Sequence, residues 1–315
     1  MGSGGGVTGS GSKPRSIGEG PGSSQGGLLP VVSLLFAATL WGTLWYPLRR
    51  LEEAGLPGLW ATLAIYLAPL LLSPWLLRGA ARVSWRTESR WLLLLLFASG
   101  WCNVSFILAV IDGQVVRVLL LFYLSPVWAV LLGHWLIGEH LTRETLGVMA
   151  IALSGAGIML WEPEIGLPWP REGADWLALS SGVAFALLNV SVRRLQEVPL
   201  GVKTTLSWCG VVLVAGVGLL AATKRPPEAD GVVWLAAAVL GLLVMSVMTW
   251  TVQYGVTHLP VRKSSVILLF EIVAGAVSAF LLAGEALTLR DWLGGGLIVL
   301  AAYLSARTEG DQASR

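Results

Sequence analysis

The chain has 315 residues, of which 55% are hydrophobic and only 13% charged, and its mean hydropathy is +0.73. A soluble domain of this size carries roughly twice that share of charge, so the composition excludes a water-soluble protein and indicates a polytopic membrane protein. The net charge of +2, without any basic stripe, argues against nucleic acid as a partner. Cys102 and Cys209 lie in apolar runs, so we expect neither a disulfide nor a metal site.

Residues 1–27 are rich in glycine and serine and are too polar for a cleaved signal sequence. We expect a disordered tail, followed by a first membrane helix that acts as an uncleaved anchor. Charged residues, prolines and glycines divide the remainder into ten apolar spans, and each is long enough at about 1.5 Å per residue to cross a hydrocarbon core of about 30 Å. The predicted spans are residues 29–48, 57–77, 91–111, 116–138, 144–161, 174–192, 203–223, 232–256, 261–283 and 290–306.

Two pairs of matching segments show that the chain repeats itself. LIGEHLT at 136–142 recurs as LAGEALT at 282–288, an offset of 146 residues, and RRLEE at 49–53 recurs as RRLQE at 193–197, an offset of 144. Each half holds five spans, an odd number, so the halves must insert with opposite orientations. The sequence therefore predicts two inverted five-helix repeats, residues 28–161 and 174–306, joined by an outward linker at 162–173 and followed by a cytoplasmic tail at 307–315.

Such an inverted repeat places a site near the membrane midplane that can open to either side in turn, which is the arrangement of alternating-access carriers. The distribution of basic residues indicates the orientation. If spans alternate, one side holds 14 of the 21 lysines and arginines, which predicts that both termini are cytoplasmic. We expect the membrane to be the cell inner membrane. The other side holds Arg49, Arg50, Arg117, Arg171, Lys224, Arg225 and Arg290.

The run YLSPVW at 123–128, followed by LIGEHLT and a glycine-rich span, resembles the EamA repeat of the drug/metabolite transporter superfamily. The second half repeats it as LFEIV at 269–273 and LAGEALT. The resemblance covers about residues 30–306 and implies an all-α fold of ten helices, with a central cavity lined by the first, third, fourth, sixth, eighth and ninth. The Tyr-Leu-x-Pro run is similar to that of YddG-type amino-acid exporters. Ile272 departs from the family, because the second repeat usually has proline there, so a kink in the ninth helix is not assumed.

Glu271 is the candidate for proton coupling and for binding a substrate amine. It lies eight residues beyond Lys263, about 12 Å into the bilayer by helical rise. A carboxyl group at that depth costs several kcal/mol unless it is protonated, paired or facing a wet cavity, so we expect it to point inward. A structural glutamate tied to a neighbouring helix is the alternative.

Arg117 and Lys263 occupy equivalent places near the starts of the fourth and ninth spans. Arg117 is a candidate for attracting a substrate carboxylate, and snorkelling to headgroups is the alternative for both cations. An ion pair with Asp112, five residues earlier, is the expected structural role of Arg117.

Other candidate substrate-binding residues are aromatic or carry amides. Aromatic rings suit an amphipathic ligand, through stacking or cation–π contact, although tryptophan in membrane helices also marks interfaces. Amides more often join helices to one another. The candidates are Trp41, Trp101, Tyr123, Asn189 and Gln253.

Glu139 and Glu285 follow helix ends, and we expect their carboxylates to face water while Thr142 and Thr288 cap the next helices. Glycines in the fifth and tenth spans suit close packing within one chain, hence a monomer, with a homodimer as the alternative.

No His-Glu-x-x-His, Gly-x-Ser-x-Gly or Walker A pattern occurs, so we expect no enzyme, cofactor or metal. The sequence predicts a secondary transporter that exports small amphipathic metabolites, with neutral and aromatic amino acids as the leading class. Export of drugs or organic cations is the alternative within transport, and a membrane interaction protein that transports nothing is the alternative outside it.

Overall fold

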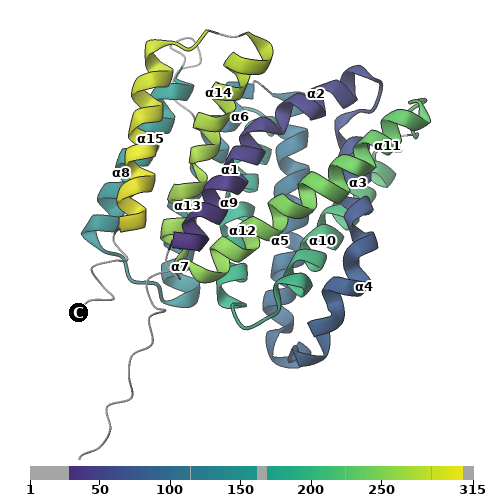
Figure 1. Cartoon of the computed structure of the whole chain (residues 1–315), viewed down its shortest axis with the longest axis horizontal. Helices are drawn as coiled ribbons and strands as arrows, with labels where there is room; N and C mark the ends of the chain where they lie inside the picture. The colour runs from purple at the N-terminus through teal and green to yellow at the C-terminus, as the bar shows by residue number, and fades with distance from the viewer. Residues whose placement is uncertain (1–27, 114, 162–168, 224, 285, 308–315) are drawn as a thin grey trace, which may run out of the picture.

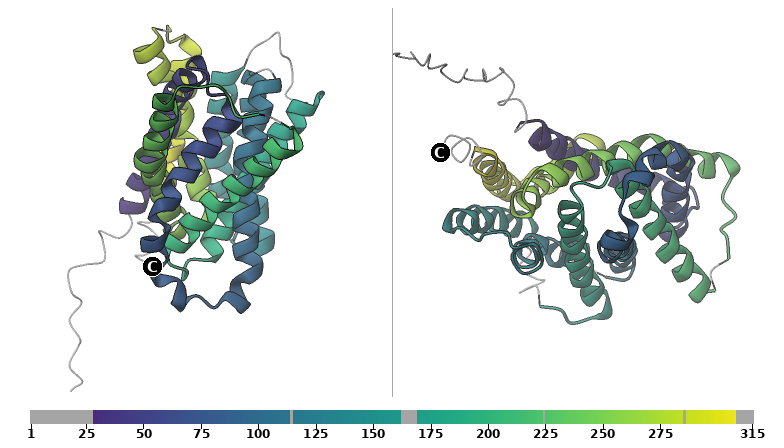
Figure 2. Two further views of the ribbon diagram at one scale, coloured as in Figure 1. Left: turned by 90° about the vertical axis from the view of Figure 1, so that its right-hand side faces the viewer. Right: turned by 90° about the horizontal axis from the view of Figure 1, so that it is seen from below.

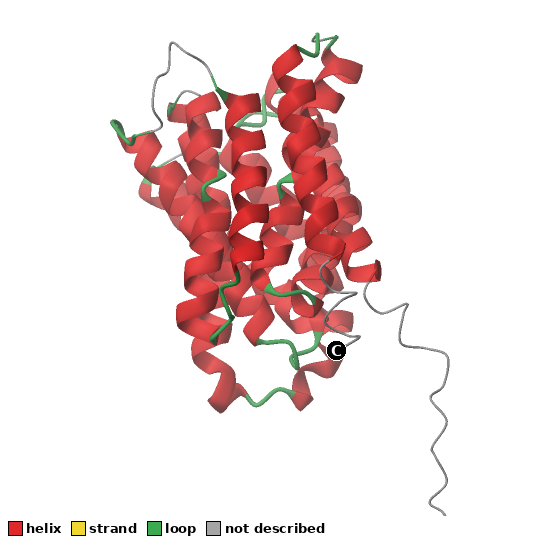
Figure 3. Cartoon of the chain, turned by 90° about the vertical axis from the view of Figure 1, so that its left-hand side faces the viewer, coloured by secondary structure: helices red, strands yellow, loops and turns green. Residues whose placement is uncertain are grey.

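The computed structural model describes residues 28–113, 115–161, 169–223, 225–284 and 286–307, and within these ranges every regular element is a helix (Figure 3). The predicted tail at 1–27, most of the predicted linker, Glu285 and the last eight residues lie outside the described ranges. The helices of the first half are α1 (Leu28–Thr43), α2 (Trp45–Glu53), α3 (Gly58–Leu67), η1 (Ala68–Leu72), α4 (Ser73–Leu76), η2 (Leu77–Arg82), α5 (Trp85–Asp112), α6 (Val115–Phe122), α7 (Ser125–Ile137) and α8 (Arg143–Leu160).

The second half follows the same plan with fewer interruptions. Its helices are α9 (Gly173–Arg194), α10 (Leu200–Ala221), α11 (Gly231–Leu240), the π-helical turn η3 (Gly241–Met245), α12 (Ser246–His258), α13 (Val261–Leu268), α14 (Phe270–Ala283) and α15 (Leu289–Arg307).

Nine helical stretches in the described ranges are long and apolar enough to span a bilayer, and several of them join two or more of these elements end to end. The tenth predicted span is α15, a 19-residue helix that carries Arg290 and Asp291 in its first turn and Arg307 in its last. It runs alongside α8, its counterpart in the first half (Figures 1 and 2). The chain therefore has the all-α membrane fold of two inverted five-helix repeats that the sequence predicts.

The first helix of each half packs against the other half. Helix α1 lies against α12, α13 and α14, whereas α9 lies against α5, α6 and α7 (Figure 1). Glycine permits the closest of these approaches: a Cβ on Gly42 would meet the Glu271 carbonyl oxygen at 2.5 Å, and one on Gly182 would meet the Phe122 carbonyl oxygen at 2.8 Å. The two halves are consequently interlocked around a shared centre.

The fourth span of each half is broken at the same place. Helix α6 ends at Phe122 and α7 begins at Ser125, while α13 ends at Leu268 and α14 begins at Phe270. Pro126 accompanies the first break, but the second occurs without proline, with Leu269 and Ile272 donating hydrogen bonds to carbonyls only three residues back. The two spans are therefore interrupted at equivalent positions although their sequences differ at this point.

Helices α8 and α15 form a pair at one side of the bundle (Figures 1 and 2). Their contact is close because a Cβ on Gly155 would meet the Gly294 carbonyl oxygen at 2.6 Å, and one on Gly294 would meet that of Gly155 at 2.5 Å. These glycines thus serve packing inside the chain. The start of α1 and the end of α15 lie toward the end of the bundle that is lower in Figure 1, which we call the lower end.

Candidate functional site

A cavity lies between the two halves, at the level of the breaks in the fourth and ninth spans. It encloses about 900 Å³ of space outside protein atoms, open solvent included, and its lining comes from α1, α3, α5 and α6 of the first half and from α9, α10, α12, α13 and α14 of the second. Helices of the second and seventh spans contribute Tyr66 and Ser207, which the family resemblance does not anticipate.

Aromatic rings form much of one wall. The ring of Phe122 lies 4.8 Å from that of Phe106 and 5.6 Å from that of Phe185, measured between centroids, and all three line the cavity together with Trp41 and Tyr66. These phenylalanines were not predicted, since in the sequence they are indistinguishable from the apolar residues that face lipid. The wall offers an apolar surface on which a ring or an aliphatic chain can pack.

Glu271 lines the cavity from the first turn of α14, immediately after the break. The positive end of the helix dipole favours a carboxylate at this position. The hydroxyl of Tyr123, at the matching break of the first half, hydrogen-bonds to the Glu271 side chain. Tyr123 is itself buried and reaches the site through Glu271. Within the described part of the chain, Glu271 is the one carboxyl group of the lining, which includes no lysine or arginine.

Two amide side chains line the cavity on the side nearer the lower end. Asn189 of α9 is 1% exposed, and neither its nitrogen nor its oxygen has a hydrogen-bond partner among the described residues. Gln253 of α12 is 3% exposed; its Nε2 donates to Ser207 Oγ at 2.9 Å, while its Oε1 has no partner there. Asn103, by contrast, is bonded to Tyr66 Oη at 2.8 Å and to the Ser99 carbonyl oxygen at 2.9 Å. The sequence shows the amides but not which of them lack partners.

Trp101 lies away from this lining. It is 46% exposed, and its Nε1 donates to Ser180 Oγ of α9 at 3.1 Å. Its role in binding remains a prediction that the cavity does not itself support.

Arg117 is also outside the cavity lining, and its predicted ion pair with Asp112 is wrong. Its Nε donates to both carboxylate oxygens of Asp175 at 2.8 Å, and its Nη2 donates to the Trp169 carbonyl oxygen. Asp175 also accepts from the backbone N–H groups of Arg171 and Glu172 before α9. Helix α6 packs along α9, which brings Arg117 to a residue 58 positions later, whereas Asp112 is exposed at the end of α5.

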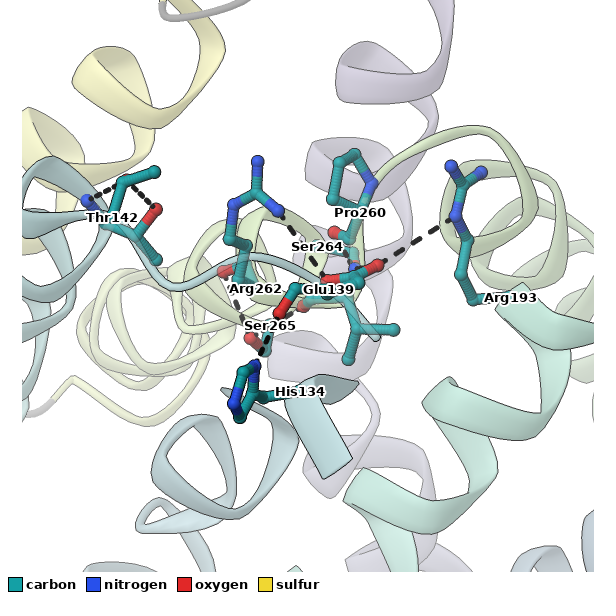
Figure 4. A network of polar contacts seen from close by, with 10 residues as sticks. His134, Glu139, Thr142, Arg193, Pro260, Arg262, Ser264 and Ser265 are labelled. Carbon is teal, nitrogen blue, oxygen red and sulfur yellow. Dashed lines mark hydrogen bonds and ion pairs between the residues drawn. The ribbon is translucent and has the colours of Figure 1, made fainter. Parts of the chain in front are cut away.

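We expected the Glu139 carboxylate to face water, but the structure buries most of it. Gly138 adopts a left-handed conformation, φ +71°, and turns the chain back over the end of α7, so that the Glu139 side chain is only 14% exposed. Its Oε1 accepts the backbone N–H of Val261 at 2.9 Å, and its carboxylate lies 4.0 Å from Arg193 and 3.9 Å from Arg262 (Figure 4). Glu139 thus connects the first half to two helices of the second at the lower end.

Thr142 caps α8 as predicted, because its Oγ1 accepts the backbone N–H of Thr145 at 3.1 Å. Thr288 stands in the equivalent place before α15, where its Oγ1 accepts the backbone N–H of Asp291 at 3.4 Å and Asp291 Oδ2 accepts that of Thr288 at 2.7 Å. No group of three histidine, cysteine or acidic residues that could hold a metal ion occurs in the described ranges.

Comparisons with known proteins agree with this architecture. The EamA-like transporter family matches residues 28–161 and, a second time, residues 173–307. A protein of Archaeoglobus fulgidus described as an uncharacterized transporter is 24% identical over 245 residues, which cover 78% of this chain and 85% of that protein. One crystal structure, 21% identical, superposes with a TM-score of 0.68 over 90% of this chain and 96% of its own, and shows the same fold. Since the family matches both halves, the chain belongs to the EamA-like transporter family.

Proposed function

We propose that the protein exports small amphipathic metabolites, with neutral and aromatic amino acids as the leading class, by alternating access through the central cavity. The observation that carries the proposal is the cavity itself. It lies between two inverted repeats, and its described lining combines one carboxyl group, Glu271, with a wall of aromatic rings. A carboxylate is the natural partner for a substrate ammonium group, and the rings suit an apolar side chain.

Glu271 is also the proposed proton-coupling group. Its hydrogen bond from Tyr123 joins the breaks of the two halves, so a change in its charge acts on both repeats at once. Substrate and proton would then compete for one carboxylate near the midplane. Such competition couples the transport of the substrate to the transport of the proton.

We further propose an inner-membrane location with the lower end in the cytoplasm. Arg193, Arg194, Lys203, Arg262 and Lys263 lie at helix ends on that side, as the positive-inside rule requires of a cytoplasmic face. In export, the substrate would then enter the cavity from the lower end, where Glu139 contacts residues of the second half.

A second candidate is an exporter of organic cations. It is favoured by the absence of lysine and arginine from the described lining, because a lipophilic cation needs only Glu271 and the aromatic wall. Amino acids need in addition a partner for their carboxylate.

The test is uptake of labelled phenylalanine, leucine and a lipophilic quaternary ammonium compound into proteoliposomes that hold the purified protein, compared with empty liposomes. Saturable uptake of the amino acids above the control supports the proposal, and its response to an imposed pH gradient decides proton coupling. Uptake of the cation alone would replace the proposal with the second candidate, and uptake of none of the three would refute both substrate classes.

A further inference from the structure

The end of the cavity that lies nearer the lower end of the bundle is lined by polar side chains. Asn189 is the residue that needs an explanation. A primary amide has two donors and two acceptor positions, and burying it without partners costs about 1–3 kcal/mol for each group left unpaired. Both amide atoms of Asn189 are buried and unpartnered among the described residues, and the residue lines the cavity. Packing between helices leaves this amide unexplained, since a leucine would fill the space at lower cost.

Gln253 stands beside it on the neighbouring helix. Arg193 Nη1 donates to the Thr257 carbonyl oxygen at 2.6 Å and so fastens α9 to α12. Asn189 precedes Arg193 by four residues, and Gln253 precedes Thr257 by four. Four residues are about one helical turn, so the two amides lie about 6 Å above the same interhelical contact. We call these two lining residues the amide patch; its unpartnered atoms are one donor nitrogen, Asn189 Nδ2, and two acceptor oxygens, Asn189 Oδ1 and Gln253 Oε1.

Basic side chains lie toward the lower end from this patch, near the ends of α9, α10 and α13. Lys203 is fully buried and donates to Thr257 Oγ1 at 2.6 Å, so Lys203 and Arg193 converge on one residue. Arg262 stands nearby, and Glu139 is shared between Arg193 and Arg262. Two arginines, Arg193 and Arg262, therefore share one carboxylate among these described groups. We therefore expect the arginine pair to favour an anion at the amide patch, whereas the carboxyl of Glu271 favours a cation elsewhere in the cavity.

We propose that Asn189 and Gln253 form the subsite for the substrate's carboxylate, so that the cavity selects zwitterionic α-amino acids over amines of the same shape. The inference rests on the proposed function and specifies how the substrate lies. The ammonium group meets Glu271, the side chain packs on the phenylalanine wall, and the carboxylate accepts hydrogen bonds from the amide of Asn189. Arg193 acts from behind the amides, without touching the substrate, by making this end attractive to an anion. Arg117 is not required, since Asp175 already neutralises it.

The experiment compares two labelled compounds that differ only in the carboxylate, phenylalanine and phenethylamine, in proteoliposomes of the wild type and of variants at position 189. The wild type should have the lower KM for phenylalanine. Asn189→Ala should raise the KM for phenylalanine by about 10-fold or more, the loss expected for hydrogen bonds to a charged group, with little change for phenethylamine. Asn189→Asp, which keeps the shape and adds a like charge, should shift the ratio of the two KM values further toward the amine.

Ser191→Ala is the matched control. Ser191 is a fully buried polar residue on the same helix that bonds the Leu187 carbonyl oxygen at 2.7 Å and is not part of the cavity lining. Its ratio of KM values should equal that of the wild type. Equal KM values for both compounds in the wild type, or equal ratios in Asn189→Ala and Ser191→Ala, would overturn the subsite while leaving transport in place. If the wild type transports neither compound, the proposed function fails first and the subsite with it. If Asn189→Asp does not fold, Asn189→Ala decides alone.

Discussion

The ion pair between Arg117 and Asp175 offers the sharpest test of whether this cation stabilises the fold or binds substrate. The Arg117 and Asp175 side chains are 8% and 4% exposed, and the guanidinium Nε contacts both carboxylate oxygens. Removing one partner of a buried pair leaves an uncompensated charge, which costs about 3–5 kcal/mol. The structure predicts where in that range each variant falls.

Arg117→Met leaves the Asp175 carboxylate with two backbone N–H donors, at 2.8 Å from Arg171 and 3.3 Å from Glu172. We therefore expect the free energy of unfolding to fall by about 3 kcal/mol, the lower end of the range. Asp175→Leu leaves the Arg117 guanidinium without its carboxylate and removes the acceptor for both N–H groups before α9. The free energy of unfolding should therefore fall by about 5 kcal/mol, the upper end of the range. Combining the two changes should cost less than their sum, because the second removes the charge that the first exposed.

The measurement is equilibrium unfolding of the purified protein in mixed detergent micelles. Arg49→Met is the control: Arg49 pairs with Glu53 on the surface of α2 with side chains 63% and 49% exposed, and such a pair contributes between zero and about 0.5 kcal/mol. A loss below about 1 kcal/mol for Arg117→Met would refute the reasoning. So would a folded Arg117→Met variant whose KM rises for phenylalanine and not for phenethylamine, because Arg117 would then be the group that binds the carboxylate.

Three further predictions concern coupling, gating and packing. Glu271→Gln should preserve folding but abolish any dependence of uptake on an imposed pH gradient; a pH response equal to that of the wild type would exclude Glu271 as the coupling group. Glu139→Gln should loosen the lower end, so that a water-soluble thiol reagent added from that side alkylates Cys102 about 10-fold faster, as located by mass spectrometry; an unchanged rate would mean that these contacts do not limit access. Gly210→Ala should lower the yield of folded protein, because the new Cβ would collide with the Leu96 carbonyl oxygen of α5, whereas Gly216→Ala on the same helix has open space and should match the wild type in size-exclusion chromatography.

Much of the architecture can be predicted from the sequence because it depends on simple quantities. Span length and hydropathy locate the helices, and the recurring LIGEHLT and LAGEALT segments establish the repeat. The inward orientation of Glu271 also follows from elementary cost, since a carboxyl at mid-membrane depth cannot face lipid. These inferences need no knowledge of which helices touch.

Inferences that depend on contacts between distant segments fail or cannot be made. Arg117 pairs with Asp175 rather than Asp112 because α9 packs against the opposite half, a crossing that local spacing does not reveal. Glu139 turns inward because Gly138 reverses the chain onto the start of α13. The break at Leu269 forms without the proline that usually signals one, where the backbone of α14 packs closely on Gly42. In each case tertiary packing outweighs the local pattern.

The two breaks show how a symmetric frame can hold an asymmetric site. At the offset of 146 residues, Ser125 of the first half corresponds to Glu271 of the second, and each follows the break in its span. In the proposed alternating-access cycle, one carboxyl in the cavity between the halves is enough, because inverting the halves exchanges the two mouths. In that proposed cycle both repeats move, whereas the carboxyl group of the cavity comes from a position where the repeats differ.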